Sequence, residues 1–178
     1  MISIAVSAQR VFTFPADLAT TKAYLCDFEQ TLKYLPYLSL VRTYARNEYR
    51  ILYSVAEAGV YYVAFYCDIQ VQFDETTQTL HVTSLAGIAP VPPKATLNSV
   101  SGQGYYTSRS VFHAAGTQTR VAYDVEIQAQ VPKRLELTLI PDAVVKRVVE
   151  NVVQRRLHEI TDAFVARSME MTLGAYHD

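Results

Sequence analysis

The sequence has no tryptophan, only two cysteines and few charged residues, and these scarcities exclude several classes of protein. Because Cys26 and Cys67 lie far apart in the chain, free thiols in a reducing compartment are expected rather than a disulfide framework. The formal net charge of −1 and the lack of a basic stripe argue against nucleic acid as a partner. Charges interrupt every apolar run well short of the ~18 residues of a membrane-spanning helix. Residues 1–8 lack a basic leader and are interpreted as a strand, so a soluble, cytoplasmic protein without stable membrane insertion is expected.

Motifs for metal, nucleotide or serine chemistry are also missing. The segment His158-Glu159-x-x-Asp162 has an aspartate where a zinc-protease helix needs its second histidine, so His158 and Asp162 are interpreted as a surface pair. Gly102-Gln103-Gly104 lacks the further glycine of a dinucleotide loop and the Lys-Ser/Thr of a P-loop, and it is interpreted as a turn. Without a Gly-x-Ser-x-Gly elbow either, the sequence predicts no metal, no cofactor and no catalytic residue.

The most regular pattern that is present lies near the end of the chain. Apolar residues repeat there at helical spacing and predict one long helix from Pro141 to about Met169. Pro141 suits a first helical turn, and Asp142 suits the positive end of the helix dipole. At 1.5 Å per residue this helix spans ~40 Å and needs a large apolar surface to pack against. The repeat consists of Val145, Val148, Val149, Val152, Val153, Leu157, Ile160 and Phe164.

Most of the chain before this helix is typical of β-strands. Consecutive strands joined by short turns indicate an antiparallel meander with the helices on one side, which is an α+β fold. At 178 residues the chain is expected to form a single domain over 1–178. The segment 86–104, rich in proline and glycine, is expected to be an irregular loop. The predicted elements are a strand over 3–13, short helices over 17–26 and 28–34, and strands over 38–45, 49–56, 60–73, 79–85, 105–114 and 118–130.

The turn between the third and fourth strands sets their register. Glu57-Ala58-Gly59 fits a three-residue hairpin loop, which places Tyr53 opposite Val63 and on the buried face with Phe65. A two-residue loop at 58–59 would reverse the two faces. The first register is favoured because it buries more apolar area.

Charged residues on two elements leave the polarity of the interior open. On strand 105–114 one face carries Arg109 and His113, and the other carries Tyr106, Ser108, Ser110 and Phe112. Phe112 and the small residues favour the second set as the inward one, which would leave Arg109 exposed. Arg10 is expected near the sheet edge with its head in water. The basic residues of the long helix are interpreted as a solvated face: Lys146, Arg147, Arg155 and Arg156.

The order of elements, with the Phe12-x-Phe14-Pro15 entry into the first helix, resembles the helix-grip fold of the START-like (SRPBCC) superfamily. That superfamily includes polyketide cyclases, pollen-allergen-type ligand binders and lipid-transfer domains. The resemblance implies a curved sheet wrapped around the long C-terminal helix, with a hydrophobic cavity between them. More local motifs are similar to a domain family of unknown function found mainly in oxygenic phototrophs: Tyr24-Leu25-x-Asp27-Phe28-Glu29, Tyr34-Leu35-Pro36, Tyr49-Arg50-Ile51, Glu57-Ala58-Gly59-Val60, Gly102-x-Gly104-Tyr105, Leu139-Ile140-Pro141 and Arg156-x-x-Glu159-Ile160.

The favoured hypothesis is a noncatalytic carrier for a hydrophobic small molecule such as a lipid, an isoprenoid or a pigment. It requires an open cavity of more than ~300 Å³, and the segment 86–104 is expected to cover the entrance. An alternative is a cyclase or hydratase, which requires a polar pair with a perturbed pKa inside the cavity. A third possibility is an assembly factor that uses an apolar outer patch around Tyr62 and Tyr66. Ligand and oligomeric state stay open, and the predicted ligand-binding residues are Tyr53, Phe65, Tyr123, Ile127, Val149 and Val153.

Overall fold

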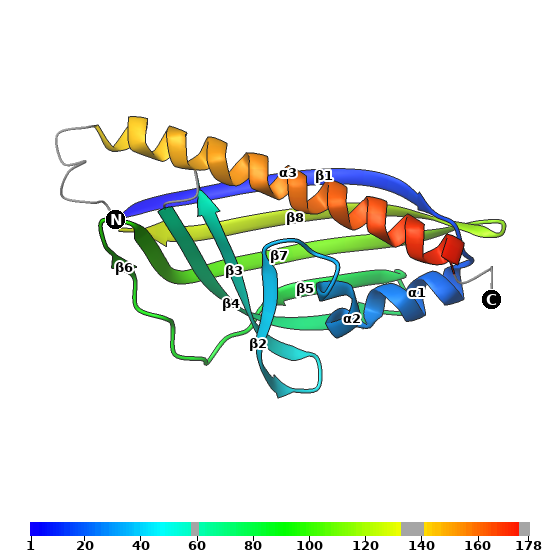
Figure 1. Cartoon of the computed structure of the whole chain (residues 1–178). Helices are drawn as coiled ribbons and strands as arrows, with labels where there is room; N and C mark the ends of the chain where they lie inside the picture. The colour runs from blue at the N-terminus through cyan, green and yellow to red at the C-terminus, as the bar shows by residue number, and fades with distance from the viewer. Residues whose placement is uncertain (58–60, 133–140, 175–178) are drawn as a thin grey trace.

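One curved sheet grips a long helix, and two short helices close one end of the grip (Figure 1). The computed structural model describes residues 1–57, 61–132 and 141–174. The elements in chain order are β1 Ile2–Phe14, α1 Leu18–Cys26, α2 Phe28–Leu32, β2 Leu38–Ala45, β3 Glu48–Glu57, β4 Tyr61–Asp74, β5 Thr79–Ser84, β6 Lys94–Ala95, β7 Ser99–Ala115, β8 Gln118–Val131 and α3 Asp142–Gly174.

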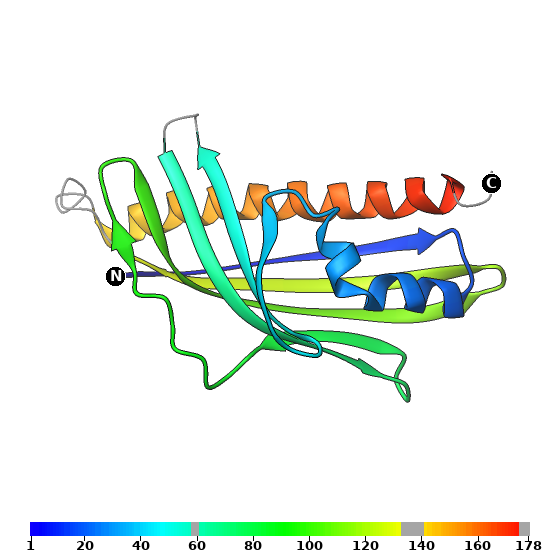
Figure 2. The same cartoon turned by 60° about the horizontal axis from the view of Figure 1, so that its bottom comes forward.

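The sheet has eight strands in the order β1-β8-β7-β5-β4-β3-β2, with the short β6 paired to β7. Neighbouring strands are antiparallel, except that the first part of β7 also runs parallel to β4. The predicted helix-grip α+β fold, its two short helices and its long C-terminal helix are confirmed. Figure 2 shows β3 and β4 crossing steeply over the direction of α3, so the sheet wraps around the helix instead of lying flat beneath it.

The register between β3 and β4 differs from the predicted one by two residues. Tyr53 lies opposite Phe65, and Val55 lies opposite Val63. Side chains alternate between faces with a period of two, so a two-residue shift leaves every side chain on its predicted face. The expected hairpin loop lies partly in residues 58–60, which are outside the described residues.

The Gly102-Gln103-Gly104 segment belongs to strand β7, so its interpretation as a turn is wrong. A Cβ atom on Gly104 would lie 3.0 Å from Sγ of Cys67, and one on Gly102 would lie 3.3 Å from the Cα of Pro93. The two glycines therefore allow other parts of the chain to approach β7 closely. The predicted irregular segment accordingly ends earlier, at residue 98, and it contains β6.

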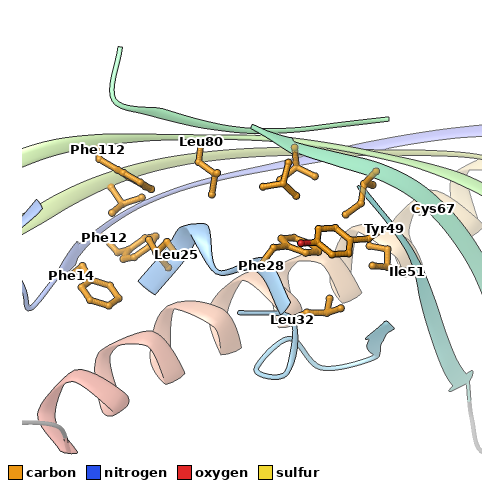
Figure 3. Close-up of a cluster of buried hydrophobic side chains, with 14 of the residues drawn as sticks. Phe12, Phe14, Leu25, Phe28, Leu32, Tyr49, Ile51, Cys67, Leu80 and Phe112 are labelled. Atoms are coloured by element: carbon orange, nitrogen blue, oxygen red, sulfur yellow. The ribbon is translucent and has the colours of Figure 1, made fainter. Parts of the chain in front are cut away.

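A dense aromatic core fills the end of the grip that α1 and α2 close (Figure 3). Asp17 caps α1 by accepting a hydrogen bond from the Thr20 amide at 2.8 Å, which fixes where the helix begins. Side chains from β1, α1, α2 and five further strands of the sheet, β3, β4, β5, β7 and β8, then pack together. The largest of them are Phe12, Phe14, Leu25, Phe28, Leu32, Tyr49, Ile51, Ile69, Leu80 and Phe112.

Helix α3 follows the edge strand β1 rather than the centre of the sheet (Figure 1). The side-chain amide of Gln154 donates to the carbonyl of Ser7 at 2.7 Å, and Arg10 forms an ion pair with Asp162 at 2.9 Å. Arg10 thus lies on an edge strand as expected, but its head is paired as well as partly exposed. The predicted pairing of His158 with Asp162 is wrong, because His158 contacts Gln154 at 2.9 Å and Asp162 contacts Arg10. These contacts hold α3 along one edge of the sheet.

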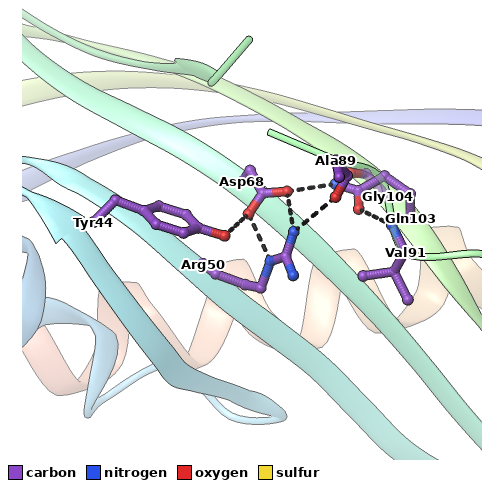
Figure 4. A network of polar contacts seen from close by, with 7 residues as sticks. All are labelled: Tyr44, Arg50, Asp68, Ala89, Val91, Gln103 and Gly104. Atoms are coloured by element: carbon purple, nitrogen blue, oxygen red, sulfur yellow. Dashed lines mark hydrogen bonds and ion pairs between the residues drawn. The ribbon is translucent and has the colours of Figure 1, made fainter. Parts of the chain in front are cut away.

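A buried carboxylate organises the outer face of the sheet (Figure 4). Asp68 on β4 is 4 % exposed and forms a two-pronged ion pair with Arg50, with N–O distances of 2.7 and 2.9 Å. The Tyr44 hydroxyl and the Gln103 amide also donate to it, at 2.8 and 3.2 Å. Burial raises the pKa of Asp68, but these donors outweigh it and the pKa lies below its ordinary value.

The same network fastens the segment between β5 and β6 to the outside of the molecule. Arg50 donates to the carbonyl of Ala89 at 3.2 Å, and the amide of Val91 donates to Gln103 at 3.1 Å. Both ribbon views place this segment on the side of the sheet away from α3 (Figures 1 and 2). The expectation that residues 86–104 cover the cavity entrance is therefore wrong for 86–99, none of which lines the cavity.

A hydrophobic cavity between the sheet and helix α3

A cavity of about 380 Å³ lies between α3 and the inner face of the sheet, beyond the aromatic core. Apolar side chains of β1, β3, β4, β8 and the first half of α3 form most of its wall. Among the described residues that line the cavity, Glu57 and Arg156 are the only charged ones. The lining residues are Ile2, Ile4, Leu35, Leu38, Ile51, Tyr53, Val55, Glu57, Tyr61, Val63, Phe65, Cys67, Val100, Gly104, Tyr106, Tyr123, Ile127, Ala129, Val131, Pro132, Val145, Val148, Val149, Val152, Val153, Arg156, Leu157 and Ile160.

All six residues predicted to bind ligand line this cavity. The strand residues come from three separate strands that the curved sheet brings together, and the two valines face them from α3. The six are Tyr53 of β3, Phe65 of β4, Tyr123 and Ile127 of β8, and Val149 and Val153 of α3. Strand alternation and helical spacing therefore identify these lining positions, although their contact with a ligand stays a prediction.

Two tyrosines form a hydroxyl pair at the inner wall of the cavity. The hydroxyl oxygens of Tyr106 on β7 and Tyr123 on β8 are 2.8 Å apart. The ring of Tyr123 also packs against Phe164 of the aromatic core, with ring centroids 6.1 Å apart. Burial raises the pKa of both phenols, against a smaller opposing effect of the Ser108 hydroxyl. Both tyrosines are therefore neutral hydrogen-bonding groups at physiological pH.

The position of this pair decides between the two faces of β7. Phe112 and Ser110 are buried on the same side as Tyr106, whereas Arg109 and His113 are exposed on the outer side. The prediction that the tyrosine and serine face points inward is confirmed. No cation on β7 thus enters the cavity.

A cluster of charges at the rim ties α3 to the end of β3. Arg156 donates from Nε and Nη2 to the two carboxylate oxygens of Glu57, at 2.8 and 3.0 Å, and from Nη1 to Glu159 at 2.6 Å. Its guanidinium also lies over the ring of Tyr37, 5.3 Å from the ring centroid. Arg155 adds a longer contact to Glu57 at 3.6 Å. These five residues are called the rim cluster below, and their ion pairs join α3 to the end of β3.

The interpretation of all four basic helix residues as a solvated face is wrong for Arg156, whose side chain is only 17 % exposed. Lys146, Arg147 and Arg155 are exposed as expected. Arg156 lies four residues after Val152 and three after Val153, on the helical spacing of the cavity-lining residues. This helical spacing is the sequence signal for an inward position, and it conflicts with the expectation that an arginine points into water.

The cavity wall also contains the thiol of Cys67, and this residue is buried. Burial raises the pKa of its thiol to about 12, so it is protonated and a poor nucleophile. Among the residues that the structure describes, no group of histidine, cysteine, aspartate and glutamate side chains is arranged to hold a metal ion. Apart from the paired charges of Glu57 and Arg156, the described wall of the cavity therefore offers apolar contact and neutral hydrogen bonding.

Substitution of Glu57 by glutamine tests the rim cluster. We expect E57Q to lower the melting temperature at pH 7 by about 3 °C, because a partly buried charged hydrogen bond contributes about 1 kcal/mol. Hydrogen bonds from Arg156 hold the pKa of Glu57 below its ordinary value of 4.5. A lowered folded pKa gives stability that is present above the unfolded pKa and is lost as the pH falls through the folded pKa.

The difference in melting temperature between wild type and E57Q is therefore expected to vanish as the pH falls below about 4.5. Asp68, whose pKa is also lowered, is present in both proteins, so its effect cancels in the difference. Calorimetry of both proteins between pH 7 and pH 3 measures this. A difference that stays constant down to pH 3 would show that the Glu57 carboxylate is not the group that matters.

Solved structures resemble this chain in shape more than in sequence. The Zhui aromatase/cyclase from Streptomyces sp. R1128 matches with a TM-score of 0.55 at 10 % identity, over 92 % of this chain and 93 % of its own. A START superfamily protein from Mycobacterium smegmatis matches with a TM-score of 0.54 at 12 % identity, over 93 % and 98 %. The chain has the START-like fold. A protein from Thermus thermophilus gives a TM-score of 0.54 at 16 % identity over 94 % and 98 %.

No protein-family model and no curated protein matches the chain. The narrower resemblance to a family of oxygenic phototrophs therefore stays a prediction. Structural similarity at 10 to 16 % identity establishes the START-like fold of this chain. It establishes neither the activity of the cyclase nor any ligand. Within its described residues, the chain has no helix with the length and apolar character needed to cross a bilayer.

Proposed function

We propose that this START-like chain acts as one domain that binds and carries a hydrophobic small molecule in the cavity beneath α3. The observation that carries the proposal is an apolar cavity of about 380 Å³ next to a core that is otherwise filled. Small-molecule sites in proteins typically have volumes of ~300–1,000 Å³ and mostly apolar walls.

The proposed ligand contacts are the six lining residues predicted from the sequence: Tyr53, Phe65, Tyr123, Ile127, Val149 and Val153. They surround the cavity from three strands and the helix, so one bound molecule would touch all four elements. Burial raises the pKa of Tyr53 to about 12, which keeps this phenol neutral as well. A lipid, an isoprenoid or a pigment fragment would suit such a wall.

A cyclase or hydratase is the second candidate, and the tyrosine pair is the observation that favours it. Tyr106 and Tyr123 meet its geometric requirement for a polar pair inside the cavity. Proton transfer at neutral pH, however, needs a group with a pKa near 7, whereas burial moves both phenols further from that value. Carriage is therefore favoured over catalysis. An outer-surface role has less support, because Tyr62 is 59 % exposed but Tyr66 is half-buried.

Fluorescence titration with N-phenylnaphthylamine tests the proposal. Emission of this neutral probe rises in apolar surroundings, so we expect a saturable increase that reaches one probe per chain. Apolar burial also gives binding a negative heat-capacity change, which calorimetry at several temperatures detects. A signal that fails to saturate would show that the probe meets only the protein surface, and it would overturn the proposal.

A further inference from the structure

The polar groups of the cavity are neutral at the inner wall and charged at the rim, and this difference affects which ligand can bind. At the inner wall stand the neutral hydroxyls of Tyr106 and Tyr123. At the rim stand charges that are already paired with each other. We infer that the cavity selects a neutral molecule with one carbonyl or hydroxyl group, held by the tyrosine pair, and discriminates against carboxylates. This inference rests on the proposed function and adds the chemical class of the ligand.

The rim cluster offers no free positive charge to an anion. All three guanidinium nitrogens of Arg156 already donate to the carboxylates of Glu57 and Glu159. Arg155 also lies near Glu57 and Glu159, at 3.6 and 3.8 Å. Two arginines therefore face two glutamates, and the formal charge of the group is zero. An anionic ligand would have to break one of these ion pairs to gain a partner.

The inner wall cannot replace the hydration of a carboxylate. Around the tyrosine pair the cavity is lined by apolar side chains and the protonated thiol of Cys67. An ionised carboxylate that enters such surroundings without a counter-charge takes up a proton instead of remaining charged. A carboxyl group with an ordinary pKa near 4.3 must then be protonated at a pH about three units above that pKa. At neutral pH, the free energy of this protonation weakens binding by up to ~1,000-fold.

A neutral oxygen fits the pair directly. Each phenol has one proton, and the hydrogen bond between Tyr106 and Tyr123 uses one of the two. The proton of the other phenol remains for a carbonyl or hydroxyl oxygen in the cavity, which would compete for it with the Ser108 hydroxyl that also acts on both phenols. Because the raised pKa of both tyrosines keeps them protonated, this donor persists across the physiological pH range.

Three probes that share one octyl chain test the inference: decane, methyl octyl ketone and nonanoate. Each is titrated as a competitor of N-phenylnaphthylamine at neutral pH. With the wild-type protein, we expect the ketone to displace the probe at a concentration at least ~10-fold lower than nonanoate does. Equal or tighter binding of nonanoate would overturn the inference and leave the proposed function intact.

The double variant Y106F/Y123F tests where the ketone binds. We expect its affinity for the ketone to fall by about 5- to 10-fold, the effect of one net hydrogen bond, and its affinity for decane to stay unchanged. Unchanged decane binding also shows that the variant is folded. Y105F is the matched control, because Tyr105 precedes Tyr106 but lies exposed on the outer face.

The outcomes distinguish the role of the tyrosine pair from the proposed function. A ketone affinity that is the same in wild type and Y106F/Y123F would overturn the role of the tyrosine pair. Failure of N-phenylnaphthylamine and decane to bind the wild-type protein at all would instead overturn the proposed function, and the inference with it.

Discussion

Replacement of Val149 by tryptophan is expected to weaken the binding of apolar molecules by about 100-fold. Val149 lines the cavity from the first half of α3, and an indole ring at this position extends into the open space. A ligand that is displaced by about four methylene groups loses ~0.8 kcal/mol for each, or ~3 kcal/mol in total. Because the ring enters a cavity and not a filled core, the cost of overpacking is expected to stay small. Titration with N-phenylnaphthylamine measures the loss.

V144W is the matched control for this variant. Val144 lies five residues earlier on the same helix, is 51 % exposed and does not line the cavity. We expect V144W to bind the probe as the wild type does, and both variants to keep melting temperatures close to that of the wild type. Equal loss of binding in V144W and V149W would show that the helix surface, and not the cavity, takes up the probe.

Removal of the Asp68 carboxylate is expected to cause the largest loss of stability. In D68A the guanidinium of Arg50 loses its hydrogen bonds to both carboxylate oxygens of Asp68. Tyr44 and Gln103 each lose an acceptor as well. Breaking a buried ion pair from one side typically costs about 3–5 kcal/mol, because the remaining charge stays buried without a partner. Urea denaturation followed by circular dichroism measures the free energy of unfolding.

Two further variants separate this charge effect from a general effect of substitution in the sheet. D124A removes an aspartate from β8, outside the network of Figure 4, and it is expected to cost less than ~1 kcal/mol. R50M/D68L removes both charges and is expected to recover most of the loss in D68A, since no unpaired buried charge remains. A double variant as unstable as D68A would contradict this account.

The fold could be predicted from the sequence because its strongest signals are local. The apolar repeat that begins at Val145 specified α3, and the alternation along β4 specified its buried face. The register of β3 against β4 could not be obtained in the same way. A shift of two residues preserves the face of every side chain, so burial cannot distinguish Tyr53 opposite Val63 from Tyr53 opposite Phe65.

The candidate site was predictable in its apolar part and not in its polar part. Facing arguments place Val149 and Val153 correctly, because an apolar residue on the buried stripe of an amphipathic helix has one favourable direction. The side chain of Arg156 has two favourable directions, toward water or toward a buried partner. Its inward direction depends on Glu57, which is distant in the sequence. The role of Gly104 likewise depends on Cys67, a neighbour that only the sheet topology brings close.

The most direct test of carriage in the cavity is native mass spectrometry of wild type and V149W after incubation with methyl octyl ketone. At a ketone concentration that saturates the wild type, we expect one ketone molecule per wild-type chain and much lower uptake by V149W, because the indole ring occupies part of the space that the ligand needs. Equal uptake of the ketone by the two proteins would contradict the claim that the cavity beneath α3 is the binding site.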